Sequence, residues 1–158
     1  MKAANLKVKQ YLESLELELD VRILPDAVRT AQLAADALGC AVGQIANSLI
    51  FCDRERDEAV LIMCAGDRRV DVGKVKNLTG IDPGKADANF VRAQTGFAIG
   101  GVPPVAHSSE LTTLLDSSLQ RFDEIWAAAG TPESVFCMTP AQLQRMTGGQ
   151  WLDFSVGK

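Results

Sequence analysis

The sequence contains few of the residues that bind metal ions. It has a single histidine, His107, and no C-x-x-C pair among its four cysteines, which are Cys40, Cys52, Cys64 and Cys137. Because a zinc site takes several cysteine or histidine ligands at short spacings, the sequence predicts no metal site and no cofactor. The cysteines are more typical of buried small hydrophobic residues than of disulfides. A cysteine nucleophile would need His107 nearby, which the sequence does not show.

Long apolar runs and a charged-then-apolar leader are also missing. The longest runs, such as Ala59 to Ala65, are far shorter than the about 20 residues that cross a bilayer. We therefore expect a cytoplasmic protein without membrane contact. The 158 residues, 47% of them hydrophobic, fit a single domain over 1–158. With a net charge of −4, a polyanion would have to meet a local basic patch.

Common nucleotide-binding and hydrolase motifs are absent as well. The chain has neither a G-x-G-x-x-G pattern nor a P-loop, so nothing supports a nucleoside triphosphate site. Ser48, Ser108 and Ser109 lie outside any G-x-S-x-G elbow, which is typical of serine hydrolases.

Helices are predicted from apolar spacing and from capping residues. Apolar side chains at three- and four-residue steps indicate an amphipathic helix over 5–17. Capping residues at the start and glycines at the end predict four more helices, over 31–38, 72–78, 87–94 and 140–147. The last of these begins with a capping box, Thr139 to Gln142, that has a proline at the first helical position.

Strands are predicted from short apolar runs between turn residues. The segments 45–51 and 59–65 flank a charged turn and indicate a buried hairpin, and Val21 to Leu24 indicates a short strand. Three further segments, Leu111 to Leu115, Glu124 to Ala128 and Ser134 to Met138, are expected to be strands of one mixed sheet. Short strands interleaved with short helices favour an α+β, mixed α/β domain.

The most unusual segment is the loop Gly100-Gly101-Val102-Pro103-Pro104. Two glycines allow positive φ and close backbone approach, and two prolines restrict the backbone after them. Such a loop can present N–H groups to a carbonyl or phosphate oxygen, although a purely structural turn has the same composition.

Other candidate residues each have a structural alternative. His107 comes after the loop and is either a general base or substrate ligand, or a hydrogen-bonded structural residue. Asn47 interrupts an apolar segment, where its amide needs partners. A basic segment around Lys74 could bind phosphates or form a solvated helix face; its cations are Arg68, Arg69, Lys74 and Lys76.

Four segments in this order resemble the YbaK/ProX family, which comprises free-standing relatives of the editing insertion domain of bacterial prolyl-tRNA synthetase. They are the helix from Thr30 to Leu38, the stretch Gln44 to Phe51, the segment Cys64 to Asp71, and Thr95 to Pro104 with its Gly-x-x-x-Pro loop. The resemblance covers the chain from about Val21 to Gly148.

The resemblance implies a trans-editing aminoacyl-tRNA deacylase in a mixed α/β domain around a bent, barrel-like sheet. Such an enzyme hydrolyses the ester of a wrong, small amino acid on tRNA; the resemblance implies tRNA(Pro) as the substrate and prolyl-tRNA synthetase as a partner. An aminoacyl ester is already activated and needs no metal or nucleophile, so we expect Gly100, Gly101 and Asn47 to act in catalysis. We expect substrate binding by Pro103, Pro104, His107, Lys74 and Thr30.

The chain departs from the family pattern at Asn47, where the family has a lysine credited with holding the substrate. A neutral hydrogen bond is worth about 0.5–1.5 kcal/mol, against about 1.5–3 kcal/mol for one to a charged group. Lys74 is a hypothetical replacement. Two other functions stay open: a silent aminoacyl-tRNA or synthetase-binding module, and a small-molecule hydrolase that uses a cysteine or His107.

Overall fold

The computed structural model describes residues 1–158 and contains five α-helices, two 3-10 turns and ten strands. The helical elements are α1 (Ala3–Ser14), α2 (Ala31–Leu38), η1 (Val42–Gln44), α3 (Val72–Thr79), α4 (Ala88–Thr95), η2 (Ser117–Arg121) and α5 (Pro140–Thr147). The strands are β1 (Val21–Ile23), β2 (Ala46–Asp53), β3 (Glu58–Ala65), β4 (Arg68–Val70), β5 (Pro83–Gly84), β6 (Thr112–Asp116), β7 (Ile125–Ala128), β8 (Ser134–Met138), β9 (Gln150–Leu152) and β10 (Ser155–Gly157). This mixture confirms the predicted α+β class.

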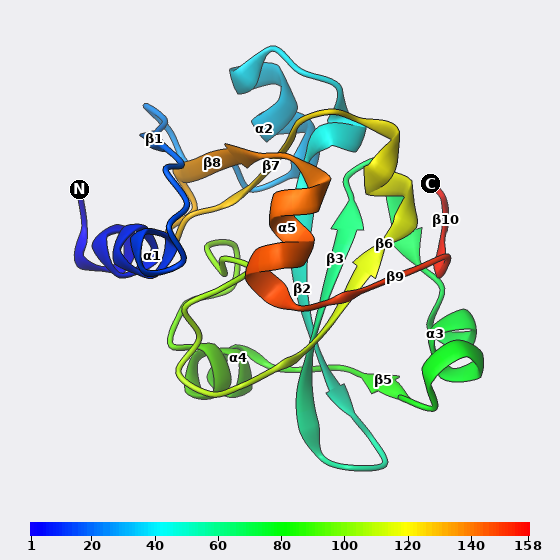
Figure 1. The fold of residues 1–158 in the computed structure, drawn as a ribbon. Helices are drawn as coiled ribbons and strands as arrows, with labels where there is room; N and C mark the ends of the chain where they lie inside the picture. Colours follow the sequence, from blue (N-terminus) through cyan, green and yellow to red (C-terminus); the bar gives the residue numbers. More distant parts are fainter.

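The long β2–β3 hairpin runs through the middle of the molecule, with the five helices around it (Figure 1). The two strands pair antiparallel from Ala46↔Ala65 to Asp53↔Glu58, which confirms the predicted hairpin. β3 is apolar at successive positions, so both of its faces are buried.

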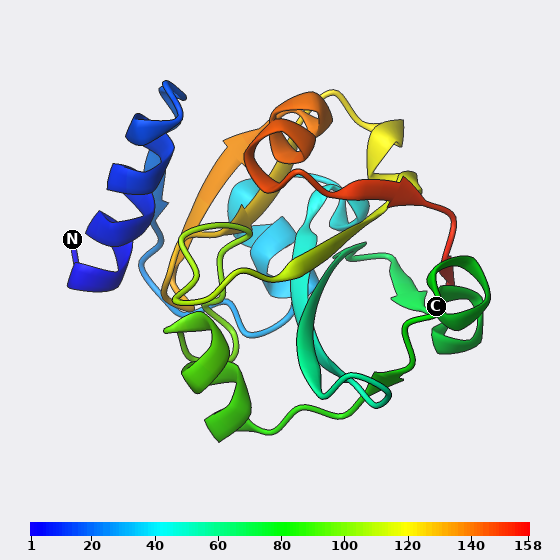
Figure 2. The same ribbon diagram turned by 60° about the horizontal axis from the view of Figure 1, so that its bottom comes forward.

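A five-stranded mixed sheet grows from this hairpin in the order β5-β2-β3-β6-β9. β6 pairs parallel to β3 and β9 parallel to β6, whereas β5 pairs with β2 only at Cys52 and Asp53. The sheet curls into a half-barrel, as the turned view in Figure 2 shows. Its two faces pack against separate hydrophobic clusters, one around Met63 and Phe136 and a smaller one around Ile62 and Phe154.

The prediction that the segments around β6, β7 and β8 belong to one sheet is wrong. β7 and β8 form a second, antiparallel sheet with β1, in the order β1-β8-β7. The turn η2 comes directly after β6 and redirects the chain away from the large sheet. The only strand pairing between the two sheets is an isolated parallel bridge from Ile45 to Trp126.

The predicted caps of α2, α3, α4 and α5 are confirmed. The side chains of Thr30, Asp71, Asp87 and Thr139 each accept a hydrogen bond from a first-turn N–H, and the glycines that end the same four helices have φ between 64° and 82°. These positive angles cost an L side chain more than they cost glycine, which is why each helix ends there. No helix is both long and apolar enough to cross a membrane.

A small two-stranded sheet, which was not predicted from the sequence, holds the last strand in place. β10 pairs antiparallel to β4, with Ser155 opposite Val70 and Gly157 opposite Arg68. The Ser155 hydroxyl donates to buried Asp116 at 2.8 Å and accepts from Arg68 Nε at 2.6 Å. Asp116 also accepts from the Ala65 N–H at 3.0 Å, so one carboxylate joins β3, β6 and β10.

Helix α1 is attached to the β7–β8 turn through Asn5, a fully buried polar residue. Its side-chain amide donates to Ala129 O at 2.8 Å, Ser134 Oγ at 2.8 Å and Thr131 Oγ1 at 3.2 Å. Since Pro132 and Ser134 also line a cavity between the two sheets, α1 supports that cavity from outside.

Replacing Asn5→Ala should lower the free energy of unfolding by about 1–3 kcal/mol, because buried acceptors in the β7–β8 turn lose their donor. Urea unfolding followed by circular dichroism measures the change. Ser14→Ala is the matched control, since its hydroxyl bonds only to the exposed carbonyl of Tyr11. A loss no larger than that of the control would contradict an anchoring role for Asn5.

Candidate active site

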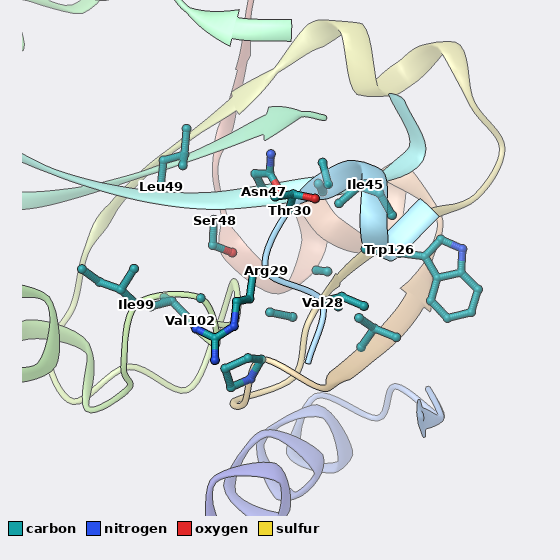
Figure 3. A pocket seen from close by; sticks show the side chains of 18 of the residues that line it. Val28, Arg29, Thr30, Ile45, Asn47, Ser48, Leu49, Ile99, Val102 and Trp126 are labelled. Carbon is teal, nitrogen blue, oxygen red and sulfur yellow. The ribbon is translucent and has the colours of Figure 1, made fainter. Parts of the chain in front are cut away.

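A cavity of about 380 Å³ lies where β2 and β7 diverge. The two strands touch at the Ile45–Trp126 bridge, and beyond it residues 45–49 and 126–128 line two walls of the cavity. Residues 28–31 at the start of α2 form a third wall, and the loop residues Ile99, Gly100 and Val102 form a fourth (Figure 3). Its volume falls in the range of small-ligand sites.

The open edge of β2 forms one wall of this cavity. From Asn47 to Phe51, β2 pairs with β3 on one edge and has no strand on the other, because β5 joins only at Cys52. In an antiparallel pair, alternate residues direct their main-chain N–H and C=O groups away from the partner. The cavity therefore borders main-chain groups that are free to bind a ligand.

The glycine-proline loop brings two unpaired amides to the cavity. Gly100 has φ 92°, and neither its N–H nor that of Val102 donates to any acceptor in the chain. Both residues line the cavity. Unpaired N–H donors of this kind can bind an oxygen that carries negative charge.

Gly101, by contrast, is a structural residue. It is buried, and its N–H donates to Ala98 O at 3.1 Å. A Cβ added there would lie 2.8 Å from Thr131 Cα and 2.9 Å from Gly130 O, so the loop packs on the β7–β8 turn only because residue 101 has no side chain. The structure thus brings Gly100 to the cavity but not Gly101, and Val102 takes its place.

Asn47 and Thr30, two of the site residues predicted from the sequence, both line the cavity. Asn47 is half-buried, and its amide makes no hydrogen bond within the chain, which leaves it free for a ligand. Figure 3 shows Asn47 and Leu49 pointing to one side of β2 and Ser48 to the other. The Thr30 hydroxyl accepts from Leu33 N at 3.1 Å and so caps α2 at the cavity wall.

The charged side chains at the cavity are all basic. Arg29 and Lys158 are its two charged lining residues, and neither forms an ion pair. An adjoining hollow of about 290 Å³ shares Ile99, Gly100 and Val102 with the cavity and adds Lys85. Arg29, Lys85 and Lys158 thus form a local basic site, and no carboxylate lines either hollow. A protein with a net charge of −4 needs a local basic site of this kind to bind a polyanion.

The structure places four expected substrate-binding residues elsewhere. Pro103 and Pro104, at the end of the loop, are buried and do not line the cavity, and His107 lines a separate polar groove together with Pro104. The His107 ring lies 2.7 Å from Pro103 O, and because a carbonyl only accepts, Nε2 carries the proton. Burial lowers the pKa of His107, which favours the neutral ring. Lys74 lies on α3, which packs by Val75 against the smaller hydrophobic cluster, and does not line the cavity.

No cysteine lines the cavity, and the most buried thiol is poorly suited to be a nucleophile. Burial and the nearby Asp116 carboxylate raise the pKa of Cys64 to about 12. No group of three or more histidine, cysteine, aspartate or glutamate side chains is arranged to hold a metal ion.

Arg29, Val102 and Lys158 line the cavity but were not predicted as site residues from the sequence. Arg29 directly precedes the Thr30 cap, so its place beside the start of α2 could have been predicted from the sequence. Val102 lies inside the predicted loop but carries no polar side chain. Lys158 had no local signal, because only the pairing of β10 with β4 brings it to this site.

Comparisons with known proteins find the same fold in a solved structure. A solved structure described as a candidate trans-editing enzyme for prolyl-tRNA synthetase superposes with a TM-score of 0.93 at 41% identity, covering 99% of both chains. The uncharacterized protein YwhH of Bacillus subtilis (strain 168) is 32% identical over 147 residues, which are 92% of this chain and 93% of the relative.

A more distant relative carries a more specific name. EbsC of Enterococcus faecalis, a candidate Cys-tRNA(Pro)/Cys-tRNA(Cys) deacylase, is 22% identical over 128 residues, covering 80% of this chain and 77% of the relative. The family model of the aminoacyl-tRNA editing domain matches residues 25–146, which include the β2 edge, the start of α2 and the loop with Gly100. The chain therefore belongs to the aminoacyl-tRNA editing domain family.

Proposed function

We propose that this protein is a trans-editing deacylase that removes a small, wrongly attached amino acid from tRNA(Pro). The observation that carries the proposal is a basic cavity bordered by two unpaired main-chain amides, those of Gly100 and Val102. Membership of the editing-domain family and the likeness to a candidate trans-editing enzyme support the reaction class. Prolyl-tRNA synthetase is the proposed partner that supplies the mischarged tRNA.

The proposed reaction needs positioning more than it needs a reactive side chain. Water attacks the carbonyl carbon of the ester while the neighbouring ribose hydroxyl positions it, and negative charge develops on the carbonyl oxygen. The N–H groups of Gly100 and Val102 donate to that oxygen, while Asn47 holds the substrate by its amide. The bond from the carbonyl carbon to the ribose oxygen then breaks, and that oxygen regains a proton.

The proposed reaction uses no metal ion and no covalent intermediate. The separation of His107 from the cavity and the absence of a lining cysteine argue against the alternative of a cysteine or histidine hydrolase.

The side chains on the cavity wall set how much room the amino acid of the substrate has. Alanines contribute much of the apolar lining; they are Ala31, Ala34, Ala46, Ala127 and Ala128. Because one methylene changes binding by only about 1–3 kcal/mol, the volume left by these walls sets which amino acid is accepted.

Deacylation of a panel of mischarged tRNA(Pro) species tests the proposal. Release of alanine, cysteine or serine should exceed the rate without protein. Gly100→Ala should lower kcat about 100-fold, because a side chain at φ 92° shifts the amide out of position. Gly148→Ala is the matched control: it also has a positive φ and open space around it, but it ends α5 away from the cavity.

Binding of charged tRNA without any release would contradict the deacylase and favour the silent binding module. Equal losses in both glycine variants would show that the Gly100 effect reflects stability rather than the position of its amide.

Arg29→Gln should raise KM for mischarged tRNA(Pro) several-fold and leave kcat nearly unchanged, because an exposed guanidinium at the cavity rim binds phosphate in ground state and transition state alike. The slope of log KM against log salt concentration should fall by about 0.7–1, the loss of one phosphate contact. Lys9→Gln, on the exposed side of α1, is the control. An unchanged KM and slope would exclude a phosphate contact at Arg29.

A further inference from the structure

Lys158 lies at the cavity with most of its hydrogen-bonding capacity unused. Its ammonium donates to Gly66 O at 2.9 Å, and this is its only hydrogen bond in the structure. An ammonium has three donors, so two remain free for a ligand. No carboxylate pairs with it, and it lines the same cavity as Asn47.

The fold delivers Lys158 to this position through a supported strand. Lys158 comes directly after β10, and β10 is held by its pairing with β4 and by the hydrogen bonds of Ser155 to Asp116 and Arg68. The acceptor of Lys158 is also fixed. A Cβ on Gly66 would lie 2.4 Å from Val42 O and 2.7 Å from Ala31 Cβ, so Gly66 packs closely between η1 and α2.

The Lys158 charge lies on the same side of the large sheet as Asn47. Asn47 is directly opposite Cys64 in the β2–β3 ladder, so the two side chains share a face. The Cys64 thiol lies 3.7 Å from Arg68 O of β4, and Arg68 is opposite Gly157 of β10, the residue before Lys158. Arg29 lies on the other side of β2: in Figure 3 its side chain extends to the side to which Ser48 points.

We propose that Lys158 contacts the substrate and supplies the positive charge for the half of the cavity that contains Asn47. Its ammonium donates a charge-assisted hydrogen bond to a negatively charged oxygen of the bound aminoacyl-tRNA end. Asn47, which is neutral, then needs only to orient that end. This inference rests on the proposed function, and it assigns the role to a residue far from Asn47 in the sequence.

Two variants, Lys158→Gln and Lys158→Met, test the inference in the full-length protein, with Lys9→Gln as the control for net charge. Each Lys158 variant should lower kcat/KM on mischarged tRNA(Pro) about 10- to 100-fold, the loss of one hydrogen bond to a charged group. Asn47→Lys in the Lys158→Gln background should restore at least part of the rate, because it returns a cation to the same side of β2.

A second substrate identifies the oxygen that Lys158 contacts. On 3′-aminoacyl-adenosine, which has no phosphate, a persistent loss in kcat points to the ester oxygen, and a loss seen only with tRNA points to phosphate. Either result supports a substrate contact. Wild-type kinetics in both Lys158 variants, a loss equal to that of Lys9→Gln, or no recovery with Asn47→Lys would overturn it.

Binding of a non-hydrolysable analogue separates this inference from the proposed function. The analogue is a short RNA ending in CCA whose terminal adenosine carries the amino acid through a 3′ amide in place of the ester. Its affinity is measured by calorimetry. If wild type releases no amino acid, the deacylase proposal fails, yet an affinity about tenfold weaker for Lys158→Gln would still support the contact. Equal affinity in both proteins would overturn the contact whatever the activity.

Discussion

The free edge of β2 from Asn47 to Phe51 is the constraint on which the site depends. Had β7 continued to pair with β2 beyond the Ile45–Trp126 bridge, main-chain hydrogen bonds would fill the space that the cavity occupies. The strands separate because β7 belongs to a second sheet, to which η2 redirects the chain after β6. An unpaired strand edge is ordinarily a liability, and here α2 and the loop around Gly100 cover it.

The charge distribution suits a site that must attract a polyanion without making the whole surface basic. Arg29, Lys85 and Lys158 surround the cavity and its adjoining hollow, while the chain as a whole carries a net charge of −4. The attraction for anions is therefore concentrated at the cavity and its adjoining hollow.

Many features of the fold were predictable because their signals lie in consecutive residues. The Thr139–Gln142 capping box, the glycines that end four helices and the apolar runs of the β2–β3 hairpin act over a few positions each, and all are confirmed. The assignment of β6, β7 and β8 to one sheet was wrong because the composition of a strand does not determine which strand it pairs with. The short strands β4, β5, β9 and β10 have too few residues to show a period.

The sequence by itself determined the fold class, the positions of α2 to α5 and the presence of an unusual glycine-proline loop, since propensity, capping and backbone freedom are local properties. The helix expected over 5–17 instead spans Ala3–Ser14. Only the tertiary structure decided which residues of that loop border the cavity: Gly100 and Val102 line it, whereas Gly101 packs on Thr131 and Pro103 O bonds to His107. It alone brought Lys158 to the cavity that contains Asn47. Such contacts join residues far apart in the chain, and no local pattern encodes them.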